Sequence, residues 1–443
     1  MRRGLTLCLS VLLSVTLLAT ACGKDVIEEQ AGPPVPTVVT FTAPVISHLD
    51  ITTDGGVAVN SKDPAQYRPC TVKVSGEEKD YAMEARGKIR GRGNSTWNWY
   101  PKKPYRIKLD VSSPFLGMAP NKDWVLLADY RDVTHMMNLV GFYLAQELGL
   151  PFANHVRYAT VTLNGEDLGL YMVTEQVEEG GHRVQLDPEE GILLALDIND
   201  GPDDRPRATD NFFSNVFWMA AAVKYPEDAT KADRDRVREE FAFLERTIES
   251  EDWAAVKQEL DVESMAKYIL IQEIISNVEM DNYPSMRSGF IHRHDNSSRW
   301  VMGPLWDCDG GFNYNWSDMY DSRGQGHTYF ESYRTLIFGS DPYYRTGAYG
   351  STPSDFFCCL FGMPEFVRLI RQLWIDNQAS LLSGLLDCLA ETETLIGTAA
   401  QADMDRWGID RYVHAEEYRK LRAWLTNRFR YLDGVIRNYP IHP

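Results

Sequence analysis

The stretch Trp306-Asp307-Cys308-Asp309-Gly310-Gly311-Phe312 decides how the rest of this chain is interpreted. It places two carboxylates one residue apart, on a turn bounded by a tryptophan and by glycines. Carboxylate oxygens are the ligands that hard divalent cations prefer in proteins. An isolated acid upstream, Asp281, could lie across the same site. We therefore predict a divalent-cation site on this turn, with Asp281 facing it.

Two basic stretches precede these acids in the chain. The first is Arg90-Gly91-Arg92-Gly93-Asn94-Ser95-Thr96-Trp97, and the second is Lys102-Lys103-Pro104-Tyr105-Arg106-Ile107-Lys108. Lysine and arginine side chains can hold phosphates, so cations followed by acids supply the parts of a phosphoryl-transfer site. The alternative is a pair of strands whose basic side chains simply face water.

The composition is that of a globular protein with a large core, arranged in two lobes or two domains. The chain has 443 residues, of which 44% are hydrophobic and 12% are aromatic. Its formal net charge of -18 argues against a nucleic-acid partner, because nucleic-acid binding needs a broad basic face. The basic residues between 86 and 108 are therefore a local positive island in an acidic protein.

The N-terminus has the pattern of an export signal. A short positive region, Met1-Arg2-Arg3, precedes an apolar run from Leu5 to Leu18 that is too short for a comfortable membrane span. Ala19-Thr20-Ala21-Cys22 then has the pattern of a bacterial lipoprotein cleavage site, with Cys22 as the lipidated residue. We expect residues 1–21 to be a signal peptide and 22–45 a proline-rich tether. The protein would then be an extracytoplasmic, membrane-anchored lipoprotein that touches the membrane only through its lipid; simple secretion is the alternative.

Residues 46–178 have the pattern of a strand-rich first lobe with one helix. In Tyr105-Arg106-Ile107-Lys108-Leu109, the two aliphatic side chains share one face and the two cations share the other, which would form one wall of a cleft. The helix is expected from about 135 to Leu148, with Asp132 or Thr134 as its cap and Gly149 as its stop. The expected strands include Val57–Val59, Cys70–Val74, Ala85–Arg90, Trp124–Ala128, and a hairpin of Tyr158–Leu163 and Gly169–Thr174 joined by Asn164-Gly165.

Residues 179–443 are expected to form a mainly helical second lobe. Helix-spaced apolar residues occupy 228–275, and 360–438 is helical again. Between them lies a long loop, 313–357, rich in tyrosine, glycine, serine and aspartate. Loops of this length are commonly functional or disordered.

Taken in order, these segments resemble the CotH family of spore-coat-like kinases, an atypical branch of the protein-kinase-like fold. The resemblance spans roughly half of the chain, from about 90 to 312. Its matching segments are Arg92–Trp97, Lys102–Lys108, Lys122–Ala128 with Asp132, Leu163–Glu166, Gly169–Tyr171, Glu175-Gln176, Asn277–Asp281 and Gly303–Asp309.

The resemblance implies a two-lobed α+β kinase-like fold that transfers phosphate from ATP to serine or threonine of a protein, with Mg2+ or Mn2+. The protein substrate would be an unidentified surface or coat protein. Asp281 would be the catalytic-loop acid, and Asp307 the principal metal ligand with Asp309 as a second ligand or an orienting group. Lys108 would reach the nucleotide phosphates, with Lys103 as the second choice. The remaining ATP contacts implied are Arg92, Asn94, Ser95 and Glu175.

The chain also departs from the family pattern. Only Gly91-x-Gly93 remains of a glycine-rich loop, and Met137 stands before Asn138 where an arginine is usual. Met286 stands where many members have an asparagine that could serve a second metal. A catalytically inactive surface lipoprotein that binds a partner is therefore the second hypothesis. The third is glycan binding by the aromatic residues of the long loop, which are Tyr314, Trp316, Tyr320, Tyr329, Tyr333, Tyr343 and Tyr344.

Overall fold

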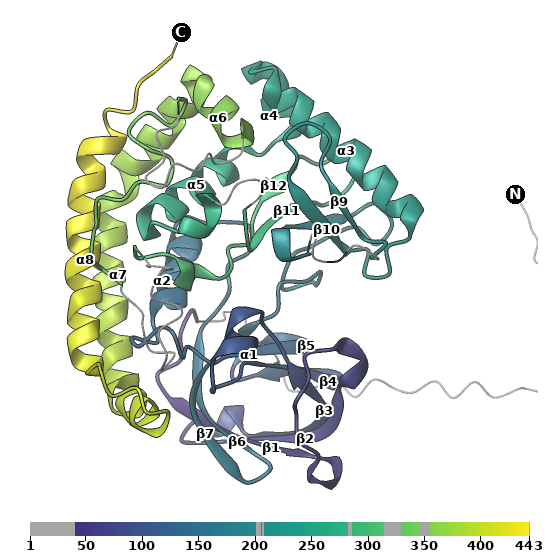
Figure 1. Ribbon diagram of the computed structural model, residues 1–443, viewed down its shortest axis with the longest axis vertical. Coiled ribbons are helices and arrows are strands. Elements are labelled where there is room, and N and C mark those ends of the chain that lie inside the picture. The colour runs from purple at the N-terminus through teal and green to yellow at the C-terminus, as the bar shows by residue number, and fades with distance from the viewer. Residues whose placement is uncertain are drawn as a thin grey trace, which may run out of the picture. The chain divides into compact units, whose positions relative to one another are not determined.

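Seven strands close into a barrel in the computed structural model, which describes residues 40–200, 205, 208–281, 286–313, 329–344 and 355–442 (Figure 1). The strand order is β1-β2-β3-β4-β5-β7-β6, and the parallel pair β1–β6 closes the ring. The other neighbouring strands run antiparallel. The strands are β1 (Ile46–Thr53), β2 (Arg68–Ser75), β3 (Met83–Gly91), β4 (Tyr105–Phe115), β5 (Met118–Leu127), β6 (Arg157–Leu163) and β7 (Glu166–Glu175).

The alternation predicted for β4 is confirmed. Ile107 and Leu109 are buried in the barrel core, whereas Arg106 and Lys108 lie on the outer face, where both form ion pairs. The predicted hairpin is β6–β7, and its turn residues Asn164 and Gly165 have φ angles of 52° and 83°. Such positive values suit an Asn-Gly turn, because asparagine and glycine tolerate the left-handed region best.

The predicted helix of this region is α2 (Met137–Glu147), and Gly149 follows it with a φ of 67°. Asp132 accepts a hydrogen bond from the Met137 N–H over 2.7 Å, so its carboxylate stabilises the start of the helix. A second, shorter helix, α1 (Ser95–Trp99), lies between β3 and β4 and was not expected from the sequence. Closure of the strands into a barrel was not expected either.

The part of the chain after the barrel contains, besides the expected helices, a five-stranded sheet that the sequence analysis did not predict. The order is β12-β11-β8-β10-β9. All five residues of β8 are buried, so this strand lacks the polar–apolar alternation by which a half-exposed strand is recognised. The strands are β8 (Ile192–Leu196), β9 (Asn211–Phe213), β10 (Ala220–Tyr225), β11 (Gly289–Arg293) and β12 (Val301–Met302).

Helices surround this second sheet and continue to the C-terminus (Figure 1). The helical segment expected over 228–275 is divided into α3 (Lys231–Glu249), α4 (Trp253–Glu259) and α5 (Val262–Ile275). Thr230 and Asp233 form a capping box at the start of α3, and Asp252 and Asp261 cap the next two helices. The C-terminal helices are α6 (Asp355–Gly362), α7 (Pro364–Arg406) and α8 (His414–Ile436). Of the loop expected over 313–357, residues 355–357 belong to α6, and 314–328 and 345–354 lie outside the described residues.

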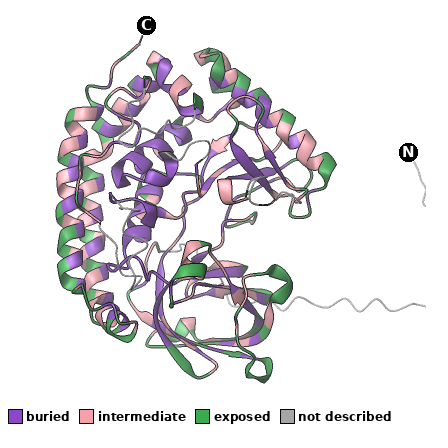
Figure 2. Cartoon of the chain, viewed as in Figure 1, coloured by how far each residue is buried: buried purple, intermediate pink, exposed green. Residues whose placement is uncertain are grey.

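The buried residues fill the barrel and surround α5, which is buried on nearly every side (Figure 2). The barrel and the helices belong to one compact unit.

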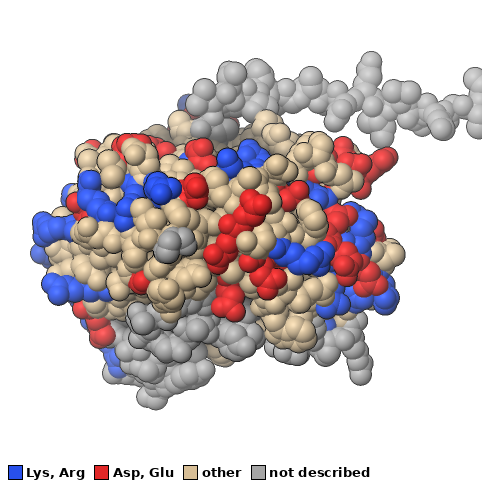
Figure 3. Space-filling model, turned by 90° about the horizontal axis from the view of Figure 1, so that it is seen from above, with Lys and Arg blue, Asp and Glu red and all other residues tan. Residues whose placement is uncertain are grey.

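Figure 3 views the end that is uppermost in Figure 1; on this face the Asp and Glu side chains form a band with Lys and Arg to either side. Within the described residues, no helix is both long and apolar enough to cross a membrane.

Candidate phosphoryl-transfer site

The acidic turn, by which we mean residues 306–312, follows β12 and is held from two sides. Asp307 has a φ of 57°, an uncommon value for a non-glycine residue, and its Oδ2 accepts a hydrogen bond from the Ser288 hydroxyl over 3.1 Å. Cys308 donates its N–H to the side-chain oxygen of Asn138, on α2, over 2.9 Å. Asp309 forms an ion pair with Arg131, with 3.0 Å between nitrogen and oxygen. The two acids of the turn therefore have different surroundings.

The glycines of the turn allow it to pack closely against the segment that follows α5. A Cβ atom on Gly310 would lie 2.8 Å from Cγ of Glu279, and one on Gly311 would lie 2.6 Å from the Ile275 carbonyl oxygen. Glu279 is itself buried, so a third carboxylate lies beside the turn. The sequence analysis missed Glu279 although it belongs to the quoted segment Asn277–Asp281, because only the aspartate of that segment was considered.

The electrostatics of this region favour a cation. Burial raises the pKa of Asp307 to about 7, the charge of Asp309 adds to the rise, and Arg131 and Arg92 oppose it. Burial and the charge of Asp307 also hold the pKa of Glu279 well above its ordinary value. A bound cation would stabilise the ionised form of both groups.

The described residues do not contain a complete protein cage for a metal. No three His, Cys, Asp or Glu side chains among them are grouped closely enough to hold an ion. This arrangement still fits Mg2+, which is commonly held by one or two carboxylates, with waters and substrate phosphates as the other ligands. Asp307 fits the role of such a carboxylate, whereas Asp309 is engaged with Arg131.

A basic pocket of about 280 Å3 lies on the barrel side of the turn. The residues Lys62, Arg90, Arg92, Gly93, Asn94, Arg106 and Gln176 line it, so it contains four cations and no acid. Lys62 donates hydrogen bonds to Asn94 Oδ1 over 2.7 Å and to the Gly93 carbonyl over 3.1 Å. The guanidinium of Arg92 lies 5.3 Å from the centre of the Trp306 ring. Arg92 therefore connects the pocket to the acidic turn.

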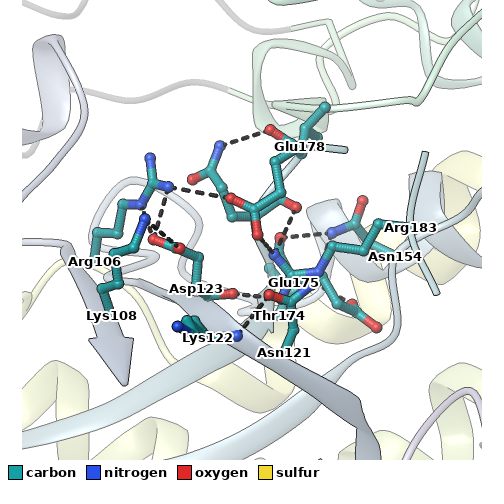
Figure 4. Close-up of polar contacts among 12 residues, drawn as sticks. Arg106, Lys108, Asn121, Lys122, Asp123, Asn154, Thr174, Glu175, Glu178 and Arg183 are labelled. Atoms are coloured by element: carbon teal, nitrogen blue, oxygen red, sulfur yellow. Dashed lines mark hydrogen bonds and ion pairs between the residues drawn. The ribbon is translucent and has the colours of Figure 1, made fainter. Parts of the chain in front are cut away.

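Like charges lie directly opposite each other on the barrel strands beside this pocket. Arg90 is in register with Arg106, and Lys88 is in register with Lys108. Such pairs destabilise a sheet unless an opposite charge is close. Asp123 supplies one: Arg106 and Lys108 both form ion pairs with it, at 2.7 Å and 3.2 Å (Figure 4). Arg106 also pairs with Glu178 at 3.2 Å, whereas Arg90 donates to the carbonyl oxygens of Lys62 and Gly91. The Arg90 side of this face is therefore suited to a further anion.

Two of the predicted ATP contacts are engaged elsewhere in the described structure. Lys103 Nζ donates hydrogen bonds to the carbonyl oxygens of Trp97 and Tyr100 at the end of α1. Glu175 accepts hydrogen bonds from the backbone N–H of His155 over 2.8 Å and, at 2.6 Å, contacts its imidazole. Neither side chain lines the basic pocket.

Lys108, the first choice for the nucleotide phosphates, does not line the pocket either and pairs with Asp123. The remaining predicted residues lie in different surroundings. Arg92 and Asn94 line the pocket, and Ser95 begins α1 next to it without lining it. Asp281 is the last residue of the short 3-10 helix Val278–Asp281, but its side chain lies outside the described residues, as does Cys22. The two departures from the family pattern, Met137 and Met286, are both buried in the core, which accounts for their apolar character. The described tyrosines of the aromatic loop vary in exposure: Tyr329 and Tyr333 pack against the core, whereas Tyr344 is 68% exposed.

The model of one protein family, described as CotH kinase protein, matches residues 89–432. This match covers most of the chain, including the acidic turn, every residue that lines the basic pocket except Lys62, and the C-terminal helices up to residue 432 of α8. The chain therefore belongs to the CotH kinase family. No curated protein matches it.

Proposed function

We propose that this protein is an ATP-dependent protein kinase that phosphorylates serine or threonine with the help of Mg2+ or Mn2+. One observation carries the proposal: a cation-lined pocket and a carboxylate turn meet at Arg92, which lies over Trp306 and influences the pKa of Asp307. Nucleotide phosphates in the pocket would then lie beside the acid that holds the metal. Membership of the CotH kinase family supports the same activity.

The residues of the pocket would bind and orient the phosphates. Arg92, Arg106 and Lys62 would neutralise phosphate oxygens, and their charges would stabilise the spread of negative charge during transfer. Lys108, which shares Asp123 with Arg106, would add a further cation. A divalent cation bound to Asp307 would neutralise the charge that develops on the transferred group. From the family resemblance, Asp281 would orient the acceptor hydroxyl and take its proton.

Location and partners form a second part of the proposal. Cys22 would carry lipid and hold the catalytic unit outside the cytoplasmic membrane, and the acceptor would be a protein on the same surface or in a coat. The mass of the mature N-terminal peptide tests the anchor. An unmodified Cys22, or full membrane retention of Cys22→Ser, would contradict it.

Intact mass spectrometry after incubation with ATP and Mg2+ or Mn2+ tests the activity, on the chain from residue 23 onward and with generic acceptor proteins present. We expect a gain of one or more phosphates that Asp281→Asn and Asp307→Asn lose. The matched control is Asp405→Asn, an exposed aspartate on the solvent side of α7. No gain in any acceptor, at any metal concentration, would overturn the kinase assignment.

An inactive, partner-binding member of the family is the second candidate. The buried side chains of Met137 and Met286 favour it, because each replaces a polar group that family members commonly carry. This alternative predicts that ATP binds without any transfer of phosphate. Measuring ATP affinity beside the mass experiment therefore distinguishes the two functions.

A further inference from the structure

The C-terminal end of α7 binds the backbone of β7. Asp403 Oδ1 accepts a hydrogen bond from the Leu170 N–H over 2.9 Å, Arg406 donates to the Asp167 carbonyl over 3.0 Å, and Trp407 donates its indole N–H to the Leu168 carbonyl over 3.2 Å. The pairing of β6 with β7 is irregular beside these residues. Backbone groups that a neighbouring strand does not pair need other partners, and α7 supplies them.

Two residues of the family resemblance are explained by this contact. Lys102 is fully buried, and its ammonium donates hydrogen bonds to Asp403 Oδ2 over 2.8 Å and to the Leu170 carbonyl. A Cβ atom on Gly169 would lie only 2.0 Å from Asp403 Oδ1. Lys102 and Gly169 therefore allow the Asp403 carboxylate to lie against the backbone of β7: Lys102 neutralises its charge, and Gly169 leaves room for it. Removing one member of such a buried ion pair leaves the other charge without compensation.

The same end of α7, together with the start of α8, also contacts the loop of residues 128–136. His135 Nε2 lies 3.6 Å from Asp403 Oδ2, and because burial holds the pKa of His135 well below its ordinary value, this is a packing contact of a neutral imidazole. His414 Nδ1, at the start of α8, lies within hydrogen-bond distance, 3.1 Å, of the Val133 carbonyl oxygen. Tyr130 of this loop stacks on Tyr100, with 5.2 Å between ring centres. The loop is thus in contact with α7, α8 and the end of α1.

The loop in turn holds the acidic turn. Arg131 makes the buried ion pair with Asp309, and Asp132 accepts the N–H of Met137, at the start of the helix whose Asn138 bonds to Cys308. Asp403 therefore packs against His135 of the loop, and hydrogen bonds and an ion pair lead from the loop region to Cys308 and Asp309, the two residues that follow Asp307. The Asp403 carboxylate also fixes Lys102, which lies between α1 and β4, next to strands that line the basic pocket.

We propose that Asp403 is a positioning residue of the phosphoryl-transfer site. Its contacts with Lys102, Leu170 and His135 hold the barrel and the loop of residues 128–136 in one arrangement, and this arrangement places the acidic turn beside the basic pocket. The inference rests on the proposed function for its catalytic meaning, but the coupling between Asp403 and the acidic turn can be measured without any activity.

Hydrogen–deuterium exchange of the chain from residue 23 onward tests this coupling directly. The variant Asp403→Asn keeps the size of the side chain and removes its charge, and Asp405→Asn changes an exposed aspartate on the same helical turn. We expect at least tenfold faster exchange in Asp403→Asn at residues 306–312, where the amides of Cys308, Gly311 and Phe312 are hydrogen-bonded. Asp405→Asn should leave this segment unchanged. Faster exchange confined to 166–171 and 400–408 would overturn the proposal.

A second variant separates positioning from stability. Lys102→Met combined with Asp403→Leu replaces the buried ion pair by apolar side chains and so leaves neither charge uncompensated. The Leu170 N–H and carbonyl lose their partners, so we expect this double variant to melt below the wild type. In its folded state, well below its melting temperature, it should bind Mn2+ at least tenfold more weakly, as measured by electron paramagnetic resonance. Wild-type exchange at 306–312 together with wild-type Mn2+ affinity in the double variant would contradict a positioning role.

The phosphate-transfer and hydrogen–deuterium exchange experiments together distinguish failure of this inference from failure of the proposed function. A wild-type chain that never transfers phosphate would remove the kinase assignment, yet exchange at 306–312 would still test the coupling. Conversely, an active wild type with an equally active Asp403→Asn would keep the kinase assignment and refute the inference. For a partly active variant, a lower kcat with an unchanged KM for ATP supports displacement of the acidic turn alone.

Discussion

Arg131 forms a buried ion pair with Asp309, and its guanidinium nitrogen lies 3.0 Å from the carboxylate oxygen. Only 4% and 9% of the two side chains are exposed, so water contributes little to their solvation. The pair neutralises the second acid of the turn and leaves Asp307 as the carboxylate better placed for a cation. The arrangement therefore favours the orienting role that the sequence analysis left open for Asp309.

The first prediction concerns the stability that this pair provides. We expect Arg131→Met to lower the free energy of unfolding by about 3–5 kcal/mol, because it leaves the Asp309 carboxylate buried without its partner. Urea unfolding followed by circular dichroism measures the loss. The control is Arg437→Met, which breaks an exposed pair with Asp433 and should change the free energy by about 0.5 kcal/mol or less. Equal effects of the two substitutions would contradict the importance of the buried pair.

The second prediction separates the two aspartates of the turn. We expect Asp307→Asn to weaken Mn2+ binding at least tenfold and to make ATP binding independent of metal, because it removes the proposed ligand. Asp309→Asn should mainly lower stability, since it removes the carboxylate that forms a buried ion pair with Arg131. Isothermal titration with Mn2+, with and without ATP, measures the first effect. The assignment of Asp307 fails if both variants bind Mn2+ as the wild type does.

The third prediction concerns the basic pocket. We expect Arg92→Met and Lys62→Met each to weaken ATP binding by roughly 10–100-fold, the range for losing a hydrogen bond to a charged group. Lys103→Met is the matched control, because this lysine caps the carbonyls of α1 and does not line the pocket. It should lower stability and leave ATP affinity unchanged. An affinity loss in Lys103→Met alone would instead support the assignment made from the sequence.

A feature of this site could be predicted from the sequence only where the residues that form it lie close together along the chain. The alternation of Ile107 and Lys108 and the Asn164-Gly165 turn are local patterns, so β4 and the hairpin could be predicted. The partners of Asp309 and Lys102 come from distant segments, and no local pattern encodes them. Lys102 lay beside Lys103 in a basic stretch, yet one lysine is buried against Asp403 and the other binds helix carbonyls.

The fourth prediction concerns the pH dependence of stability through Asp132. Burial raises the pKa of Asp132 to about 6, although hydrogen bonds from Thr134 and Met137 oppose the rise. The folded state therefore holds this proton more tightly than the unfolded state, whose pKa is near the ordinary 3.8. The resulting contribution to stability is fully present below pH 3.8 and is lost as the pH rises through about 6.

The variant Asp132→Asn isolates this contribution. A shift of about two pH units corresponds to about 3 kcal/mol, so the difference in unfolding free energy between wild type and variant should change by up to that amount across the window. Urea unfolding at closely spaced pH values measures the difference. Parallel pH profiles of the two proteins would show that Asp132 titrates normally in the folded state.

The fifth prediction addresses the two acids of the segment after α5, Asp281 and Glu279. The family resemblance assigns the acceptor hydroxyl to Asp281, whereas the structure places Glu279 beside the acidic turn at Gly310. General base catalysis contributes about 10²–10⁴-fold. We therefore expect Asp281→Asn to lower kcat at least a hundredfold and to leave the affinities for ATP and Mn2+ unchanged.

Glu279→Gln should have the opposite pattern, because it removes a carboxyl group that a bound cation would ionise beside the acidic turn, without removing the proton acceptor. Mn2+ should bind more weakly, while kcat at saturating metal should remain close to that of the wild type. Single-turnover transfer from ATP, measured over a range of Mn2+ concentrations, separates the two effects. If Glu279→Gln abolishes transfer at saturating metal and Asp281→Asn remains active, then Glu279 is the acid that takes the hydroxyl proton, and the resemblance has identified the right segment but the wrong residue.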